Sequence, residues 1–172
     1  DEGTSEDAGT GNAELSDEEL LKVVQAGLAG KGGESLVAEM ALEHIITRVT
    51  DEGIVIEIFD IENDPLYEPE TDHPTEILRE ISRLLSDTLM IVENRISFAG
   101  HSRTYSQLQI NNPAWDLSVS RAHAMRKLLE AENLPPERVE RVIGYGQQKP
   151  QLSNTMAYRN NRLEIVLLRD DV

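Results

Sequence analysis

The sequence has no cysteine, only 4% aromatic residues and no long apolar run. Without cysteine there are no disulfides, no thiol nucleophiles and no cysteine-ligated metals. No apolar segment approaches the roughly 18–20 residues that a membrane-spanning helix needs, and no signal peptide is recognisable. Because the chain begins with Asp1 rather than methionine, we expect it to be a fragment or a processed product. The absence of a membrane segment here therefore does not imply its absence from the parent protein.

Basic residues are also scarce, since 16 Lys and Arg are outnumbered by 32 Asp and Glu, which gives a net charge of −16. This balance argues against a nucleic-acid partner, because phosphate binding requires a basic surface. It argues equally against an anionic lipid surface. The acidic excess is uneven, because residues 1–19 hold eight acids and no base, which is half of the net charge. With their glycine, serine and threonine content, residues 1–13 are predicted to form a disordered acidic linker.

Residues 14–50 are predicted to form an amphipathic helical extension. Ser16 is expected to cap the first helix, and Glu19 completes a capping box. The glycines that follow Leu28 end this helix. A second helix is predicted over residues 34–47, where apolar residues recur at helical spacing. The apolar faces of both helices are expected to pack, either within the chain or across a dimer.

Residues 51–170 are predicted to form one folded domain in which strands and helices alternate. The first helix of this domain is expected to start from a cap at Thr71 or Asp72, with Pro74 in its first turn. The resulting order, β-α-β-α-β-β, predicts an α/β (α+β) two-layer sandwich, a mixed sheet with helices on one face. The strands are predicted at residues 54–59, 96–99, 139–145 and 163–168, and the second helix at residues 117–130.

The sequence offers no catalytic or metal-binding constellation. The four histidines lack the H-x-x-x-H or H-E-x-x-H spacing of metal ligands. Ser102 follows a strand as in a nucleophile elbow, but Thr104 stands where the elbow requires glycine. Gly144 and Gly146 begin like a dinucleotide fingerprint, but no helix follows them. We therefore predict no enzyme, no catalytic residue, no metal and no cofactor.

Four short sequence blocks follow one another along the chain: GHS at 100–102, LSVSRA at 117–122, GYG at 144–146 with Pro150, and RNNRLE at 159–164. Together they resemble the signature of the OmpA-like peptidoglycan-binding family, which runs GHTD, LSxxRA, GxG with a later proline, and NRRVE. The resemblance covers about residues 54–168 and implies a β-α-β-α-β-β sandwich. Within the family, residues 51–60 and 65–68 look most like the MotB family of flagellar stator proteins, and the helical lead-in fits that family as well.

The resemblance implies a site for the diaminopimelate of the peptidoglycan stem peptide. Arg121 matches the arginine of LSxxRA, which takes a carboxylate, and a guanidinium presents a planar fork that suits this group. Arg162 matches the second arginine of the last block. Ser102 and Leu117 complete the implied site. The structural alternative for Arg121 is an ion pair that only caps the start of its helix.

Two positions depart from the family pattern. Arg103 stands where the family has the aspartate of GHTD, which takes the ammonium or amide side of the ligand. Ala114 stands where an asparagine is usual, four residues before the serine of LSxxRA. Losing a charged partner from such a site costs on the order of 2–5 kcal/mol. Asp116 or a backbone carbonyl is expected to replace the missing contacts, across the long loop at residues 104–113.

Two functions of different classes follow. The first is a non-catalytic, dimeric periplasmic anchor that binds peptidoglycan. An N-terminal helix absent from this chain would tether it to the inner membrane and join a MotA-like stator partner. The second is an interaction module that keeps the scaffold, has weakened or lost diaminopimelate binding, and docks to an envelope or motor protein. A wall hydrolase is a third possibility, but no catalytic constellation supports it.

Overall fold

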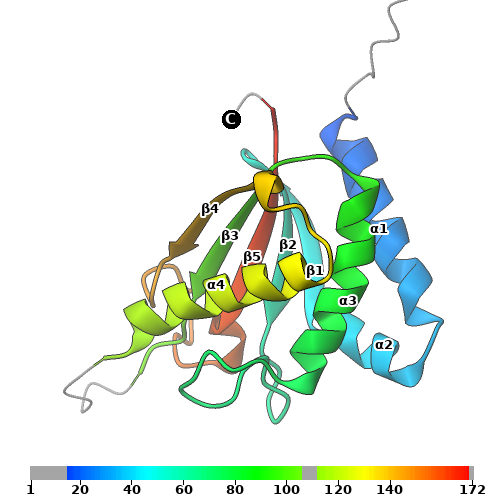
Figure 1. Cartoon of the computed structure of the whole chain (residues 1–172). Helices are drawn as coiled ribbons and strands as arrows, with labels where there is room; N and C mark the ends of the chain where they lie inside the picture. The colour runs from blue at the N-terminus through cyan, green and yellow to red at the C-terminus, as the bar shows by residue number, and fades with distance from the viewer. Residues whose placement is uncertain (1–14, 106–111, 171–172) are drawn as a thin grey trace, which may run out of the picture.

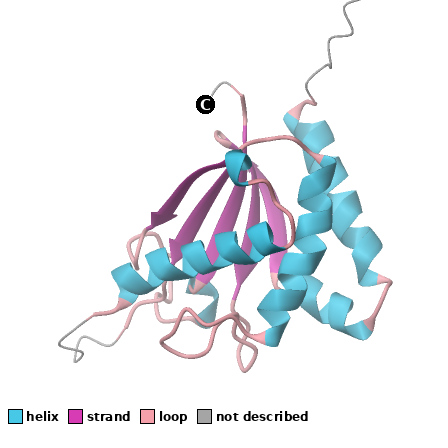
Figure 2. Cartoon of the chain, in the orientation of Figure 1, coloured by secondary structure: helices cyan, strands magenta, loops and turns pink. Residues whose placement is uncertain are grey.

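A five-stranded mixed sheet with helices on one face organises the computed structural model, which describes residues 15–105 and 112–170 (Figures 1 and 2). The predicted two-layer α+β sandwich is therefore confirmed. The acidic linker predicted for residues 1–13 lies outside the described residues. The helices are α1 (Asp17–Gly32), α2 (Leu36–Leu42), α3 (Glu76–Ile91) and α4 (Ala114–Ala131), with short 3-10 turns at Pro136–Arg138 and Tyr158–Asn160. The strands are β1 (Ile45–Thr50), β2 (Gly53–Phe59), β3 (Ile96–His101), β4 (Val139–Gly144) and β5 (Arg162–Leu168).

The strand order is β1-β2-β5-β3-β4, which places the last strand of the chain at the centre of the sheet. Strands β3 and β4 run parallel, and α4 connects them on the helical face. The other pairs are antiparallel. All four predicted strands are confirmed, with boundaries that differ by one or two residues.

The helix predicted over residues 34–47 is wrong after Leu42, because residues 45–50 form strand β1. Three of the six residues of β1 are β-branched aliphatic residues and two are threonines, a composition that favours strands. A two-residue turn joins β1 to β2, and Thr50 pairs directly with Gly53. Gly53 has a φ of 143°, which a residue with a side chain rarely adopts. The residues assigned to the end of the helical extension thus form an edge of the sheet.

The cap predicted for α3 is also wrong. The N-cap is Thr75, and neither Thr71 nor Asp72 lies in the helix. The Thr75 hydroxyl makes no capping bond and donates instead to the carbonyls of Pro65 and Leu66, at 2.8 and 2.9 Å. Pro74 precedes the helix rather than entering its first turn. The loop from residue 60 to residue 75 is therefore longer than predicted and is held by its own hydrogen bonds.

Helix α1 begins as predicted and packs within the chain. The Ser16 hydroxyl accepts a hydrogen bond from the Glu19 amide at 3.3 Å. The buried side chains of α1 are Leu20, Val24 and Leu28, and they join the main hydrophobic core. In this structure the apolar face of α1 therefore lies against the domain, next to α3 (Figure 1), whereas Leu36, Val37 and Met40 of α2 are exposed.

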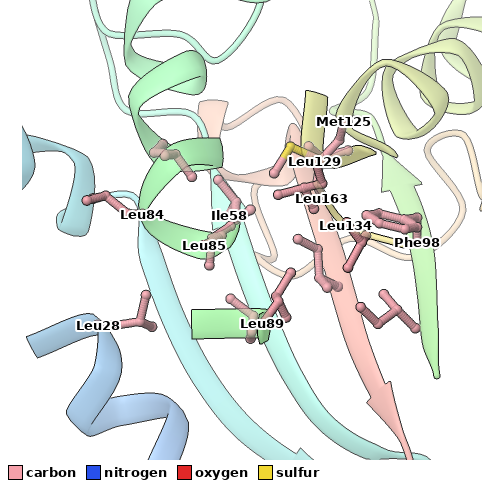
Figure 3. Close-up of a cluster of buried hydrophobic side chains, with 14 of the residues drawn as sticks. Leu28, Ile58, Leu84, Leu85, Leu89, Phe98, Met125, Leu129, Leu134 and Leu163 are labelled. Carbon is pink, nitrogen blue, oxygen red and sulfur yellow. The ribbon is translucent and has the colours of Figure 1, made fainter. Parts of the chain in front are cut away.

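The core lies between the helical layer and the sheet. Figure 3 shows Leu85 of α3 close to Ile58 of β2, and Met125 and Leu129 of α4 close to Leu163 of β5. All of these side chains are almost fully buried. None of the helices formed by the described residues combines the length and apolarity needed to cross a membrane.

Candidate functional site

Arg121 lies in the second turn of α4 and is only 8% exposed. Its Nε donates to the Thr71 carbonyl at 2.8 Å, and its guanidinium carbon lies 5.0 Å from the centre of the Tyr67 ring. The Tyr67 hydroxyl donates to the Arg121 carbonyl at 2.7 Å. No carboxylate of residues 15–105 and 112–170 lies within 4.0 Å of the Arg121 guanidinium nitrogens. The ion pair considered as the structural alternative for this arginine is thus absent from the described residues.

Asp60 organises the loop beside Arg121. One carboxylate oxygen accepts from the Leu66 amide at 2.9 Å, and the other accepts from Asn161 Nδ2 at 3.1 Å. Burial raises the pKa of Asp60, while the two hydrogen bonds and the charge of Arg121 act in the opposite direction. Asp60 therefore links the end of β2 to the start of β5 and to the loop that supplies Tyr67 and Thr71.

Ser102 and Arg103 follow β3 and reach the same network. The Ser102 amide donates to the Gly146 carbonyl at 2.8 Å, and its hydroxyl donates to the Arg103 carbonyl at 2.8 Å. Ser102 is buried, and its amide and hydroxyl both donate to backbone carbonyls of the protein itself. The Arg103 amide donates to Asn161 Oδ1 at 2.8 Å. Asn161 thus joins Arg103 to Asp60, and Asp60 lies close to Arg121.

Leu117 and Asp116 lie at the start of α4 but have different surroundings. Leu117 is buried, while Asp116 is exposed. Asp116 lines an open groove of about 480 Å³ with Asp72, Trp115 and other residues of the outer side of α4. Arg121 reaches the edge of this region through its bond to Thr71, the neighbour of Asp72.

Asn112 provides an amide side chain close to Ala114. Ala114 is buried, and its own amide donates to Asn112 Oδ1 at 3.0 Å. Asn112 Nδ2 donates to Gln147 Oε1 at 3.1 Å. An amide side chain is therefore present at the start of α4, although it comes from a residue two positions earlier.

Arg162 lies on the sheet face that carries no helix. Its Nη2 donates to the Lys149 carbonyl at 2.7 Å, and its Nε lies 3.3 Å from Glu57 Oε1 and 3.4 Å from Glu164 Oε1. The next residue, Leu163, belongs to the core on the other face, as strand alternation requires. The structure thus brings Ser102, Arg103 and Arg121 into one network and places Arg162 in a separate ion cluster.

The ion cluster around Arg162 compensates two carboxylates that face each other across the sheet. Glu57 of β2 pairs directly with Glu164 of β5, and like charges in such positions repel. Arg48 donates to both, to Glu57 Oε2 at 3.0 Å and to Glu164 Oε1 at 3.1 Å. Arg159 Nη2 lies 3.8 Å from Glu57 Oε2. The Glu57 side chain is fully buried, so these arginines are needed to hold its charge.

This ion cluster predicts acid sensitivity. Burial alone would raise the pKa of Glu164, but His101, Arg162 and Arg48 together lower it from 4.5 to about 2. Between these values the unfolded chain binds more protons, so the free energy of unfolding should fall as the pH drops from about 4.5 toward 2. Urea denaturation across this range should show a flatter pH dependence for Glu164→Gln than for the wild type. An equal pH dependence of the free energy of unfolding in the two proteins would contradict the lowered pKa of Glu164.

The serine of the LSVSRA block has a structural role. Ser118 Oγ accepts from the Gly146 amide at 2.9 Å, which ties α4 to the turn after β4. Tyr67 and the Thr71 carbonyl, which orient Arg121, were not predicted as site residues. A buried tyrosine hydroxyl needs a hydrogen-bond partner, and this requirement was the signal that could have indicated a contact between Tyr67 and another segment. Among the residues that the structure describes, no group of His, Asp or Glu side chains could hold a metal ion.

The fold and this network define an α+β domain class, in which a mixed sheet carries its helices on one face and a buried arginine lies within α4. The chain belongs to the OmpA family, whose sequence model matches residues 71–163, slightly more than half of the 172 residues. The recognition made from the four sequence blocks is thereby confirmed. Motility protein B of Escherichia coli K12 is 31% identical over 103 residues, which cover 59% of this chain. These residues are 33% of that protein, so the chain spans about a third of the length of the curated relatives it matches.

Solved structures support the same fold. The periplasmic domain of Helicobacter pylori MotB has a TM-score of 0.63 at 17% identity and covers 73% of this chain and 82% of its own. A MotB-like protein of Desulfovibrio vulgaris has a TM-score of 0.66 at 18% identity and covers 90% and 96%. The cell wall anchor of the T6SS of Pseudomonas aeruginosa has a TM-score of 0.63 at 22% identity and covers 83% and 97%. At these identities the likeness establishes the fold.

Proposed function

We propose that this chain is the non-catalytic, peptidoglycan-binding part of a flagellar stator subunit and anchors an ion-driven stator to the cell wall. The observation that carries the proposal is the state of Arg121. It is buried, it is oriented by Thr71 and Tyr67, and it has no carboxylate partner among the described residues. The ligand in this proposal is the stem peptide with its diaminopimelate.

The cost of burying a charge explains why Arg121 points to a ligand. A buried cation is unfavourable unless it is paired and hydrogen-bonded. Only Nε of Arg121 donates to another described residue, so the two Nη nitrogens remain for an external acceptor. A carboxylate accepts from such a pair in a bidentate geometry. The Tyr67 ring restricts the guanidinium and prepares it for that contact.

The assembly around the chain is part of the same proposal. The relatives named motility protein B and the periplasmic domains of MotB support a periplasmic location. We place the chain as a homodimer, tethered to the inner membrane by an N-terminal helix outside this sequence and joined through it to a MotA-like partner. The helices of residues 14–50 would connect that tether to the wall domain at residues 51–170, a division that stays a prediction.

Co-sedimentation with purified peptidoglycan sacculi tests the proposal. The wild type is expected to sediment, and Arg121→Ala is expected to bind at least about 10-fold more weakly, because a charge-assisted bidentate contact is worth roughly 1.5–3 kcal/mol. Arg121→Lys should also lose most of the binding, since an ammonium group lacks the planar fork. A thermal melt of each variant shows whether the fold is kept.

Arg95→Ala is the matched control. Arg95 precedes β3, is exposed and pairs with Glu140 Oε2 at 2.6 Å, so this variant removes the same charge away from the groove beside α4. It should sediment like the wild type. Folded wild-type protein that does not sediment would refute the anchor. It would favour the alternative, an OmpA-like scaffold that has lost diaminopimelate and docks to another protein.

A further inference from the structure

We propose that Arg103, on the loop after β3, forms a second carboxylate-binding group, connected to the Arg121 site through Asn161 and Asp60, so that the site takes an acidic peptide with two free carboxylates. This inference rests on the proposed function and specifies its ligand. It assigns a binding role to a residue whose charge is opposite to that of the family pattern.

The first observation is that the Arg103 guanidinium makes cation–π contacts with two aromatic rings. Its guanidinium carbon lies 5.0 Å from the centre of the Tyr158 ring and 6.0 Å from that of Tyr105. Tyr158 is 46% exposed, so this pair of contacts lies at the protein surface. Cation–π contacts of this kind limit the rotamers of a long side chain while leaving its N–H groups available to an acceptor.

The second observation is that Arg103 has no acidic partner in the part of the chain that the structure describes. No carboxylate of the described residues lies within 4.0 Å of its guanidinium nitrogens. The adjoining segment outside the described residues, 106–111, contains no Asp or Glu in its sequence. By contrast, Arg48, Arg159 and Arg162 on the open sheet face all lie within 4.0 Å of a carboxylate. Among the described residues the Arg103 guanidinium is thus available to an external carboxylate.

The third observation is the connection between the two arginines. The Arg103 amide donates to Asn161 Oδ1, and Asn161 Nδ2 donates to Asp60. Arg121 lies close enough to Asp60 for its positive charge to act on the pKa of that carboxyl. Asp60 is the acid of this network, and both its oxygens accept from uncharged donors. No ion pair joins Asp60 to either arginine among the described residues, so both guanidinium groups remain available to an anionic ligand.

These contacts specify the chemistry of the ligand. A stem peptide with free carboxylates offers one group to Arg121 and another to Arg103. Amidation of one carboxylate removes its charge and its second acceptor oxygen, so one arginine would lose its partner. An aspartate at position 103 would instead have favoured an ammonium group. We therefore expect this chain to prefer unamidated stem peptide.

Calorimetric titration with two synthetic stem peptides tests the inference. Both peptides contain diaminopimelate, and they differ only in that one of its carboxylates is amidated in the second. The wild type should bind the free-acid peptide at least 10-fold more tightly than the amidated one. Arg103→Gln should reduce this ratio to near one while still binding both peptides. Arg95→Gln is the control for net charge, because Arg95 is exposed and pairs with Glu140, and it should keep the wild-type ratio.

Two results would overturn the inference. Equal binding of the two peptides by the wild type, with binding still lost in Arg121→Ala, would remove Arg103 from recognition and leave the proposed anchor intact. An unchanged ratio in Arg103→Gln would do the same. Failure of the wild type to bind either peptide or sacculi would overturn the proposed function together with this inference.

Discussion

Replacing Glu57 with alanine is expected to lower the free energy of unfolding by about 3–5 kcal/mol at neutral pH, the usual cost of removing one partner from a buried ion pair. Glu57 is fully buried and has three arginines around it, Arg48, Arg159 and Arg162. Arg162 is itself almost fully buried. Without Glu57, Glu164 alone would remain to balance them, and the positive charges would repel each other inside the protein. Urea denaturation followed by circular dichroism measures the change.

Glu140→Ala is the matched control for this prediction. Glu140 also lies on a strand and pairs with an arginine, Arg95, but both side chains are more than 40% exposed. Exposed pairs contribute at most about 1 kcal/mol, so this variant should stay close to the wild type. Glu57→Gln keeps the shape of the side chain and offers a milder variant if the alanine protein does not fold. A Glu57 variant as stable as Glu140→Ala would show that the buried ion cluster contributes no net stability.

Alanine at Gly100 is expected to reduce the free energy of unfolding by about 3 kcal/mol or more, because it overpacks a backbone contact. A Cβ at this position would lie 2.0 Å from the Ser118 carbonyl oxygen and 3.3 Å from the Ala122 side chain. Neither atom can move without shifting α4 away from β3. Because α4 also carries Arg121, such a shift should weaken peptidoglycan binding too. Thermal denaturation and sacculus co-sedimentation measure the two effects.

Gly30→Ala provides the opposite control. Gly30 lies in α1, and a Cβ there would meet no atom within 4 Å. Alanine has a higher helix propensity than glycine, so this variant should gain about 0.5–1 kcal/mol. If Gly100→Ala and Gly30→Ala change stability in the same direction, close contact between β3 and α4 is not what requires glycine at position 100.

The β1 error shows where a local pattern was insufficient. Residues 34–47 carry apolar residues at helical spacing, yet Ile45–Thr50 pair with β2 as a strand. A short run of β-branched residues is compatible with either state until an edge of a sheet is available to receive it. That edge is formed by β2, and its position depends on the whole sheet.

The sequence by itself determined the class of fold and four of the five strands, and its family resemblance gave Arg121 as a candidate ligand-binding residue. Apolar periodicity and turn residues are local properties, so they can be read along the chain. The tertiary structure alone decided that Arg121 has no carboxylate partner among residues 15–105 and 112–170 and that Arg162 belongs to an ion cluster on the other face of the sheet. It also decided that Asn161 connects Arg103 to Asp60 across about a hundred residues. These contacts join segments far apart in the chain, and only the packing of β5 between β2 and β3 brings them together.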